Sequence, residues 1–163
     1  MIDVTLNPAT DLVLDRFVDV PPALVWKCWT EPEHLMPWFC PVPWKTTACT
    51  VDLRPGGGFT TKMEGPEGES HEVTGCYLEV VPHRRLSWTS ALGPDYRPNP
   101  ESGLTFTAVI SLEPKGTGTR YLVQALHRDA EGARVHADMG FVEGWGKALE
   151  QMVDYAGTLQ GRG

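Results

Sequence analysis

The sequence lacks any apolar run that could cross a lipid bilayer, which takes about 18 consecutive residues. Its first residues, MIDVTLNPATD, contain neither a basic start nor an apolar segment, so they do not resemble a signal peptide. We therefore expect a cytoplasmic protein that makes no contact with a membrane.

Clusters of basic residues are missing as well. The chain has 14 Lys and Arg residues against 21 Asp and Glu residues, which gives a formal net charge of -7. Because proteins that bind DNA or RNA normally present a basic patch, we expect no nucleic-acid partner. The acidic excess favours solubility instead.

Common metal and catalytic motifs are absent too. The sequence contains no C-x-x-C, no G-x-S-x-G and no H-E-x-x-H, and no Lys-Ser/Thr follows its glycine triplet at 56–58. We expect no metal and no cofactor. We expect the four cysteines to be reduced thiols that pack as small apolar side chains: Cys28, Cys40, Cys49 and Cys76.

The length and composition indicate one ordinary globular domain. The chain has 163 residues, of which 41% are hydrophobic and 21% charged. This length is enough to bury a core without disulfide bonds. We expect a single domain over residues 1–163.

Alternating apolar and β-branched residues, separated by Pro and Gly, predict a series of strands. The predicted strands are 12–20, 46–53, 59–64, 71–81, 85–91, 104–113 and 119–127. Two short helices are predicted after the first strand, at 23–29 and 31–38, with Thr30 as the cap of the second. Gly75 marks a predicted bend or bulge, and the Pro/Gly-rich segment 93–103 is typical of a lid or rim.

A long helix is predicted from about residue 133 to 159. Its apolar stripe follows steps of three and four residues: Val135, Met139, Val142, Trp145, Leu149, Met152, Val153, Ala156 and Leu159. Gly140, Gly144 and Gly146 each cost about 1 kcal/mol of helix propensity, which indicates a bend or a close approach to another element. Strands followed by a terminal helix define an α+β class.

A strongly curved sheet with one apolar face is not tightly filled by one long helix. The predicted architecture therefore leaves a cavity between the sheet and the C-terminal helix, suited to a small molecule. Arg16 shares a strand face with Leu12 and Leu14. We expect its charge to be paired or turned away, and the alternative is that it holds an anionic ligand.

Five segments together resemble the START-like superfamily, also called SRPBCC or the birch-pollen-allergen fold. They are VPPALVWKCWTEPEHLMPWF (20–39), CPVPWK (40–45), VDLRPGGGF (51–59), GCYLEVVPHRRLSWT (75–89) and HADMGFVEGWGKALEQM (136–152). The resemblance covers about residues 10–160 and is strongest to the branch of the activator of the 90-kDa heat-shock protein ATPase, which includes polyketide cyclase-like proteins. It implies a helix-grip fold, in which a curved antiparallel sheet wraps around a long C-terminal helix.

The resemblance does not identify an activity, because this superfamily hosts carriers, sensors, cyclases and co-chaperones. His127 and His136 flank the junction between the last strand and the long helix. Such a pair could bind a metal or act as general acid and base. We favour a structural role, in which the histidines hydrogen-bond loop backbone or cap the junction. No carboxylate or cysteine stands at ligand spacing to support a metal.

Aromatic side chains suit a planar ligand because they have large flat faces. Among the tryptophans, Trp29 and Trp145 are assigned to the core, whereas Trp38 and Trp88 are candidates for the pocket. The complete set of predicted ligand-binding residues is Trp38, Trp88, Phe106, Tyr121, His127, His136 and Met139.

Three functions follow from these observations. The first is a non-enzymatic binder of a small apolar or aromatic molecule, with Tyr121, His127 or Arg16 orienting one polar group. The second is an enzyme of the cyclase, dehydratase or hydrolase type that uses the cavity histidines. The third is a chaperone-interacting module, although the eukaryotic activator carries an additional N-terminal domain. A homodimer is compatible with all three.

Overall fold

The computed structural model describes residues 4–100 and 103–161, so positions 101–102 of the predicted 93–103 loop and the extreme termini lie outside the described residues. The strands are β1 (Asp11–Val18), β2 (Lys45–Val51), β3 (Gly58–Glu64), β4 (Ser70–Val81), β5 (Arg85–Thr89), β6 (Phe106–Lys115) and β7 (Gly118–His127). The helices are α1 (Pro22–Thr30), α2 (Pro32–Leu35), α3 (Ala130–Asp138) and α4 (Phe141–Gln160), with a short 3-10 turn, η1 (Pro94–Tyr96).

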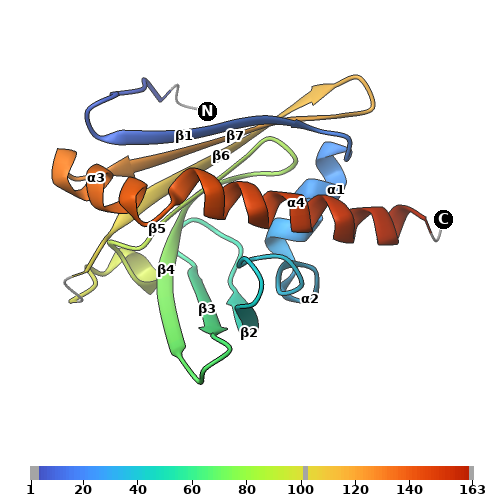
Figure 1. Ribbon diagram of the computed structural model, residues 1–163. Helices are drawn as coiled ribbons and strands as arrows, with labels where there is room; N and C mark the ends of the chain where they lie inside the picture. Colours follow the sequence, from blue (N-terminus) through green and yellow to red (C-terminus); the bar gives the residue numbers. More distant parts are fainter. Residues whose placement is uncertain (1–3, 101–102, 162–163) are drawn as a thin grey trace.

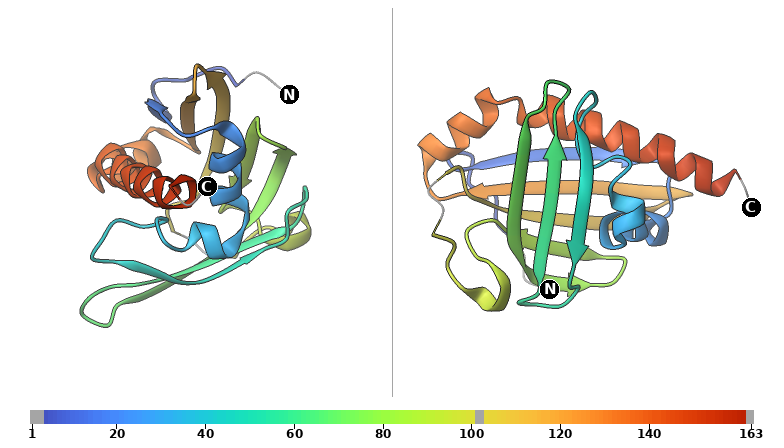
Figure 2. Two further views of the ribbon diagram at one scale, coloured as in Figure 1. Left: turned by 90° about the vertical axis from the view of Figure 1, so that its right-hand side faces the viewer. Right: turned by 90° about the horizontal axis from the view of Figure 1, so that it is seen from below.

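The strands form one seven-stranded antiparallel sheet in the order β1-β7-β6-β5-β4-β3-β2. The sheet curves around α4 (Figure 1). Seen nearly along its axis, α4 lies on the concave side, with β1 and β7 above it and the β3–β4 hairpin below it (Figure 2). The α+β helix-grip prediction is confirmed, including the two short helices after the first strand.

The alternating pattern of β6 and β7 explains which face of the sheet is buried. Ala108 pairs with Ala125 and Ile110 pairs with Val123, and all four side chains are buried. Since paired residues of neighbouring strands lie on the same face, each apolar column continues across the sheet. These columns form the floor of the interior beneath α4.

The predicted C-terminal helix is divided into α3 and α4, so the bend that its glycines indicate is present at the first of them, Gly140. Gly140 adopts a left-handed conformation with φ 87° and precedes Phe141, the first residue of α4. An L side chain rarely adopts this backbone angle, so glycine permits the break. At Gly144 and Gly146 an added Cβ would meet nothing within 4 Å, so no close approach explains those two glycines.

The helix α2 is shorter than predicted and lacks the predicted cap. The hydroxyl of Thr30 donates to the carbonyl oxygen of Trp26 at 2.7 Å, inside α1, and Glu31 occupies the cap position without a side-chain hydrogen bond. Packing stabilises both short helices instead, because Trp29 and Leu35 are completely buried. The predicted bulge at Gly75 lies two residues further along β4, between Tyr77 and Glu79.

One side chain of α4 ties this helix to the connection between α2 and β2. The Nε2 atom of Gln151 donates to the carbonyl oxygens of Trp38 and Cys40, at 3.2 and 2.9 Å. Its Oε1 atom accepts from the amide of Val42 at 3.0 Å. Gln151 therefore fixes α4 relative to the segment between α2 and β2.

Within the described part of the chain, no helix combines the length and the apolar character that crossing a membrane requires.

Candidate functional site

The interior between the sheet and α4 is lined by aromatic rings. Trp88 contacts Phe106 with ring centroids 5.5 Å apart, and it lies nearly parallel to Trp145, with an angle of 17° between the rings. Trp38 and Tyr121 are also buried in this cluster. The fold thus brings together most of the predicted ligand-binding residues, contributed by the sheet, α3 and the segment after α2.

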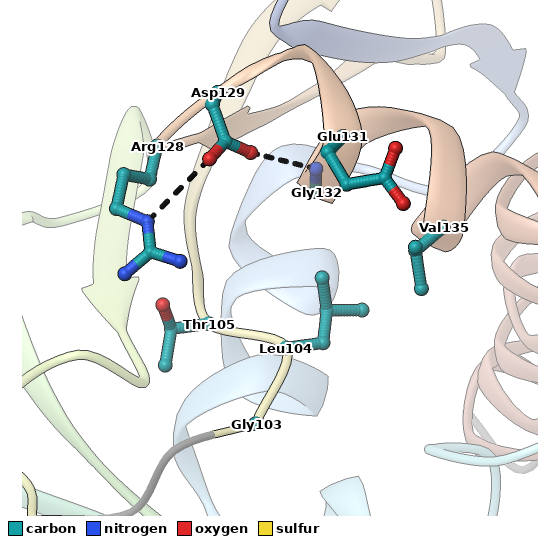
Figure 3. A pocket seen from close by; sticks show the side chains of 8 residues that line it. All are labelled: Gly103, Leu104, Thr105, Arg128, Asp129, Glu131, Gly132 and Val135. Atoms are coloured by element: carbon teal, nitrogen blue, oxygen red, sulfur yellow. Dashed lines mark hydrogen bonds and ion pairs between the residues drawn. The ribbon is translucent and has the colours of Figure 1, made fainter.

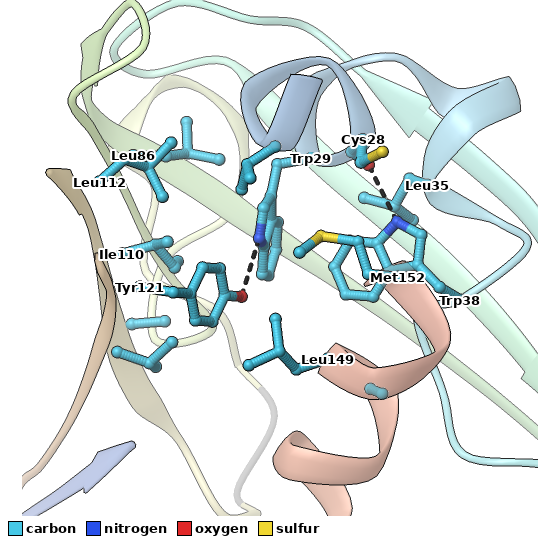
Figure 4. Packing of buried hydrophobic residues seen from close by; sticks show 14 of the residues in the cluster. Cys28, Trp29, Leu35, Trp38, Leu86, Ile110, Leu112, Tyr121, Leu149 and Met152 are labelled. Atoms are coloured by element: carbon cyan, nitrogen blue, oxygen red, sulfur yellow. Dashed lines mark hydrogen bonds between the residues drawn. The ribbon is translucent and has the colours of Figure 1, made fainter. Parts of the chain in front are cut away.

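Trp29 connects the two sides of the cluster (Figure 4). Its Nε1 atom donates to the hydroxyl oxygen of Tyr121 at 2.9 Å, and its ring lies 5.1 Å from that of Trp38. It also stacks on Trp145 at 6.3 Å. Trp29 and Trp145, which the sequence assigns to the core, therefore join the predicted pocket residues into one network.

Two polar atoms in this interior have no hydrogen-bond partner among the described residues: the hydroxyl oxygen of Tyr77 and Nε1 of Trp88. Tyr77 is 0% exposed and Trp88 is 6% exposed. Leaving a buried polar group unpaired costs about 1–3 kcal/mol, and nearly all such groups in proteins are paired. The two atoms therefore mark a place where a partner would stabilise the fold.

Tyr77 and Trp88 are neighbours. They are directly paired residues of β4 and β5. Phe59 contacts both rings, with centroid distances of 5.3 Å to Tyr77 and 5.5 Å to Trp88. The two unpaired donors thus belong to one region of the interior.

Tyr77 is the site residue that the sequence analysis missed. Its strand was predicted, but the register across β4 and β5 was needed to place it beside Trp88. Burial, with a smaller contribution from Cys49, raises the pKa of Tyr77, so its hydroxyl keeps the proton and can donate. Burial also raises the pKa of Cys49 to about 11, so this thiol is no ready nucleophile.

The two histidines meet at the end of the sheet. Nε2 of His127 lies 2.8 Å from Nδ1 of His136, and Nδ1 of His127 lies 2.8 Å from the carbonyl oxygen of Thr10. Because a carbonyl oxygen only accepts, Nδ1 of His127 carries the hydrogen. In the neutral pair, Nε2 of His127 therefore accepts from Nδ1–H of His136. Of the favoured structural roles, a hydrogen bond to loop backbone is present at His127, whose acceptor Thr10 lies just before β1.

The surroundings of His136 keep it neutral. Its ring contacts Phe106 and Phe141 at centroid distances of 4.6 and 5.0 Å. Burial, and then the proximity of His127, lower its pKa to about 4. At neutral pH its remaining nitrogen, Nε2, carries a lone pair, so the pair has the chemistry of a weak general base at one end of the aromatic cluster.

The expectation that Met139 faces the interior was wrong. Its side chain is 70% exposed. It lies at the end of α3, just before the left-handed Gly140, and this break rotates it away from the stripe that continues in α4. Val142, which follows the break, is 44% exposed for the same reason.

Two pockets in the described part of the chain lie outside the aromatic interior. One, of about 620 Å³, is a groove between β1 and α4. Arg16 lines this groove, and its Nη1 donates to the carbonyl oxygen of Asp15. The other, of about 210 Å³, lies beside the start of α3, where Asp129 accepts from the amide of Gly132 (Figure 3). The cavity expected between sheet and helix is neither of these, and it stays a prediction.

One surface group has the composition of a metal site. Glu31, Glu33 and His34 place possible ligand atoms within 4.8 Å of one another. However, Nδ1 of His34 is engaged with the hydroxyl of Tyr155 at 2.6 Å, and Glu33 is largely exposed. Exposed acidic groups commonly come this close without an ion, so we assign no metal to this group.

A curved antiparallel sheet that wraps around a long C-terminal helix is the helix-grip fold of the START-like class of proteins. Residues 19–157 match the family described as activator of Hsp90 ATPase homolog 1-like protein. The chain therefore belongs to this family, a branch of the START-like superfamily. The comparison with curated proteins gave no match.

Solved structures agree with this assignment. A crystal structure of a protein from Nitrosomonas europaea has 44% sequence identity and a TM-score of 0.91, covering 96% of this chain and 99% of that one. A solution structure of a protein from Arthrobacter aurescens has 24% identity, a TM-score of 0.80, and coverage of 96% and 92%. The AHSA1-like protein from Aeromonas hydrophila has 19% identity, a TM-score of 0.68, and coverage of 92% and 94%. The latter two show similarity of fold alone.

Proposed function

We propose that the protein binds a small apolar or aromatic molecule in the interior between the sheet and α4. The observation that carries this proposal is the pair of unpaired buried donors, Tyr77 and Trp88, within the aromatic cluster. A ligand with one polar group would satisfy them while its apolar body contacts the rings.

The half-buried Trp145 is the side chain best placed to make room for such a molecule. It lies on α4 and contacts Trp88, Phe106 and Trp29. It is also only partly buried, unlike Trp88 and Trp29. A rotation of this one side chain outward would expose the face of Trp88 without breaking the sheet.

The proposal is tested first by denaturing mass spectrometry of protein purified gently from its native host, to detect a co-purified small molecule. The second test is a titration with the neutral fluorescent probe N-phenyl-1-naphthylamine, for which we expect saturable binding to one site. Trp88→Leu should weaken binding about tenfold or more, because it removes the aromatic face that the ligand contacts. Val42→Ala, which changes a side chain that is 65% exposed, is the matched control. No bound compound and no probe binding would contradict the proposal.

A second candidate is an enzyme that moves a proton through His127 and His136. The observation in its favour is their direct contact at 2.8 Å, with His136 packed against Phe106 of the aromatic cluster. For any substrate found, replacing both histidines with Gln should lower turnover about a hundredfold or more. Unchanged turnover in the double variant would exclude this mechanism.

The name of the family links its fold to the Hsp90 ATPase. No contact among the described residues points to a chaperone surface, so a chaperone-associated role and a homodimer stay predictions. A pull-down with the host's own Hsp90 tests the former, and light scattering tests the latter.

A further inference from the structure

The unpaired donors also restrict the chemistry of the ligand. We propose that the ligand is a planar, uncharged molecule whose acceptor oxygen, such as a ring ketone, receives hydrogen bonds from the Tyr77 hydroxyl and from Nε1 of Trp88. This inference rests on the proposed binding function and adds to it the polarity, charge and shape of the molecule.

The other tryptophans of the cluster show that its polar atoms are normally satisfied from within the protein. Nε1 of Trp29 donates to the hydroxyl oxygen of Tyr121 at 2.9 Å, and Nε1 of Trp38 donates to the carbonyl oxygen of Cys28 at 3.2 Å. Trp88 has the same group and similar burial but no acceptor among the described residues. The missing acceptor is therefore specific to the region around Trp88 and Tyr77.

The missing partner must accept hydrogen bonds. The indole nitrogen of Trp88 only donates, so a hydroxyl hydrogen or an ammonium group cannot satisfy it. The hydroxyl of Tyr77 can donate because burial holds it in its neutral form. One oxygen with two lone pairs, such as a ketone oxygen, can accept from one or both of these neighbours.

The missing partner is also better uncharged. The rings in contact with Trp88 are Phe59, Phe106 and Trp145, none of which carries a positive charge. Phe106 in turn contacts His136, whose pKa of about 4 leaves it neutral at physiological pH. A buried carboxylate would lose its hydration there without a balancing charge, so a neutral carbonyl is favoured over an anion.

The arrangement of the rings favours a flat molecule. Trp88 and Trp145 are nearly parallel, and Tyr77 and Phe59 are stacked at an angle of 21°. With Trp145 rotated outward, a planar ligand can stack on the face of Trp88 that Trp145 covers, while its oxygen lies at the ring edges, where the two donors are.

The test uses two planar probes of almost equal size that differ in one carbonyl group, 9-fluorenone and fluorene. Binding is followed by quenching of tryptophan fluorescence and by calorimetry. We expect 9-fluorenone to bind at least about tenfold more tightly than fluorene, because a site built for an acceptor discriminates against a molecule that lacks one. The anion 9-fluorenone-4-carboxylate should bind more weakly than 9-fluorenone.

Variants locate the effect. Tyr77→Phe and Trp88→Phe should each reduce the preference for 9-fluorenone, and the double variant should bind both probes equally. Trp44→Phe is the matched control, because it makes the same change at a tryptophan outside the buried cluster. Circular dichroism and thermal unfolding of each variant verify that it is folded.

The possible results separate this inference from the binding function. Equal binding of both probes by the unmodified protein would leave the binding function standing and overturn the proposed acceptor. A preference for 9-fluorenone that survives in the double variant would assign the carbonyl to other residues and also overturn it. Tighter binding of the carboxylate would overturn the uncharged class. Binding of none of the probes would contradict both proposals.

Discussion

Tyr77 and Tyr121 are both buried in the same interior, but their hydroxyl groups have different surroundings. The hydroxyl oxygen of Tyr121 accepts from Trp29, whereas that of Tyr77 has no partner among the described residues. A buried tyrosine hydroxyl therefore has a structural role at one position and is available to a ligand at the other.

This contrast predicts that replacing each tyrosine with Phe affects the stability of the ligand-free protein differently. Tyr121→Phe leaves Nε1 of Trp29 buried without an acceptor, so we expect a loss of about 1–3 kcal/mol in the free energy of unfolding. Tyr77→Phe removes a group that is already unpaired, so its stability should be unchanged or slightly higher. Urea unfolding of the two variants measures the difference. A larger loss for Tyr77→Phe would show that its hydroxyl is paired inside the protein.

The histidine pair predicts a dependence of stability on pH. The pKa of His136 is lowered to about 4 in the folded state, from an ordinary value near 6.5. Between these values the unfolded chain binds the proton more readily than the folded one, so stability falls as the pH falls from about 6.5 to 4. The contribution of this residue to the loss is roughly 2–3 kcal/mol.

Unfolding measured across this pH range checks the expectation. His136→Leu should flatten the pH dependence, whereas His71→Gln, a change at an exposed position, should leave it intact. An unaltered slope in His136→Leu would show that other groups cause the acid sensitivity.

At the level of elements, the division between α3 and α4 depends on one glycine. Gly140 has φ 87°, which costs an alanine about 1–2 kcal/mol, so Gly140→Ala should destabilise the protein by that amount. Gly144 lies inside α4 with open space around its Cα, so Gly144→Ala should stabilise it by about 0.5–1 kcal/mol. Thermal unfolding of the two variants gives the comparison. Equal effects would show that the break does not require a left-handed residue.

For the whole molecule, ligand binding should appear as added stability, because a ligand bound only by the folded state shifts the unfolding equilibrium. At a free 9-fluorenone concentration about 100 times its dissociation constant, the gain is about 2.7 kcal/mol. For a domain of this size that corresponds to a rise in melting temperature of roughly 5–10 °C. Differential scanning calorimetry with and without the probe measures it, and an unchanged melting temperature despite saturation would indicate binding outside the folded interior.

Most elements of the fold could be predicted because they depend on local patterns. Alternation, β-branched content and Pro/Gly boundaries identified the strands, and Pro22 and Pro32 lie at the starts of the two short helices as expected. Two details differ from the prediction, each for a local reason. The hydroxyl of Thr30 bonds within α1 rather than capping α2. Gly140 interrupts an otherwise continuous apolar stripe.

The site was predicted less completely. Trp88 and the histidine pair were identified from composition and strand face, whereas Tyr77 was missed and Met139 was assigned to the interior although it is exposed. Both errors come from tertiary placement: the strand register for Tyr77 and the helix break for Met139. Placing Tyr77 required knowing its partner on β5, and placing Met139 required knowing that the helix turns at Gly140.

The sequence by itself determined the class of fold, since hydrophobic periodicity and the positions of Pro and Gly act over a few residues. The tertiary structure alone decided which polar groups are satisfied. Trp29 finds its acceptor on a residue 92 positions away, and His127 finds one 117 positions away. Such pairings depend on how distant segments pack together, and the packing that satisfies Trp29 and His127 leaves Tyr77 and Trp88 without acceptors among the described residues.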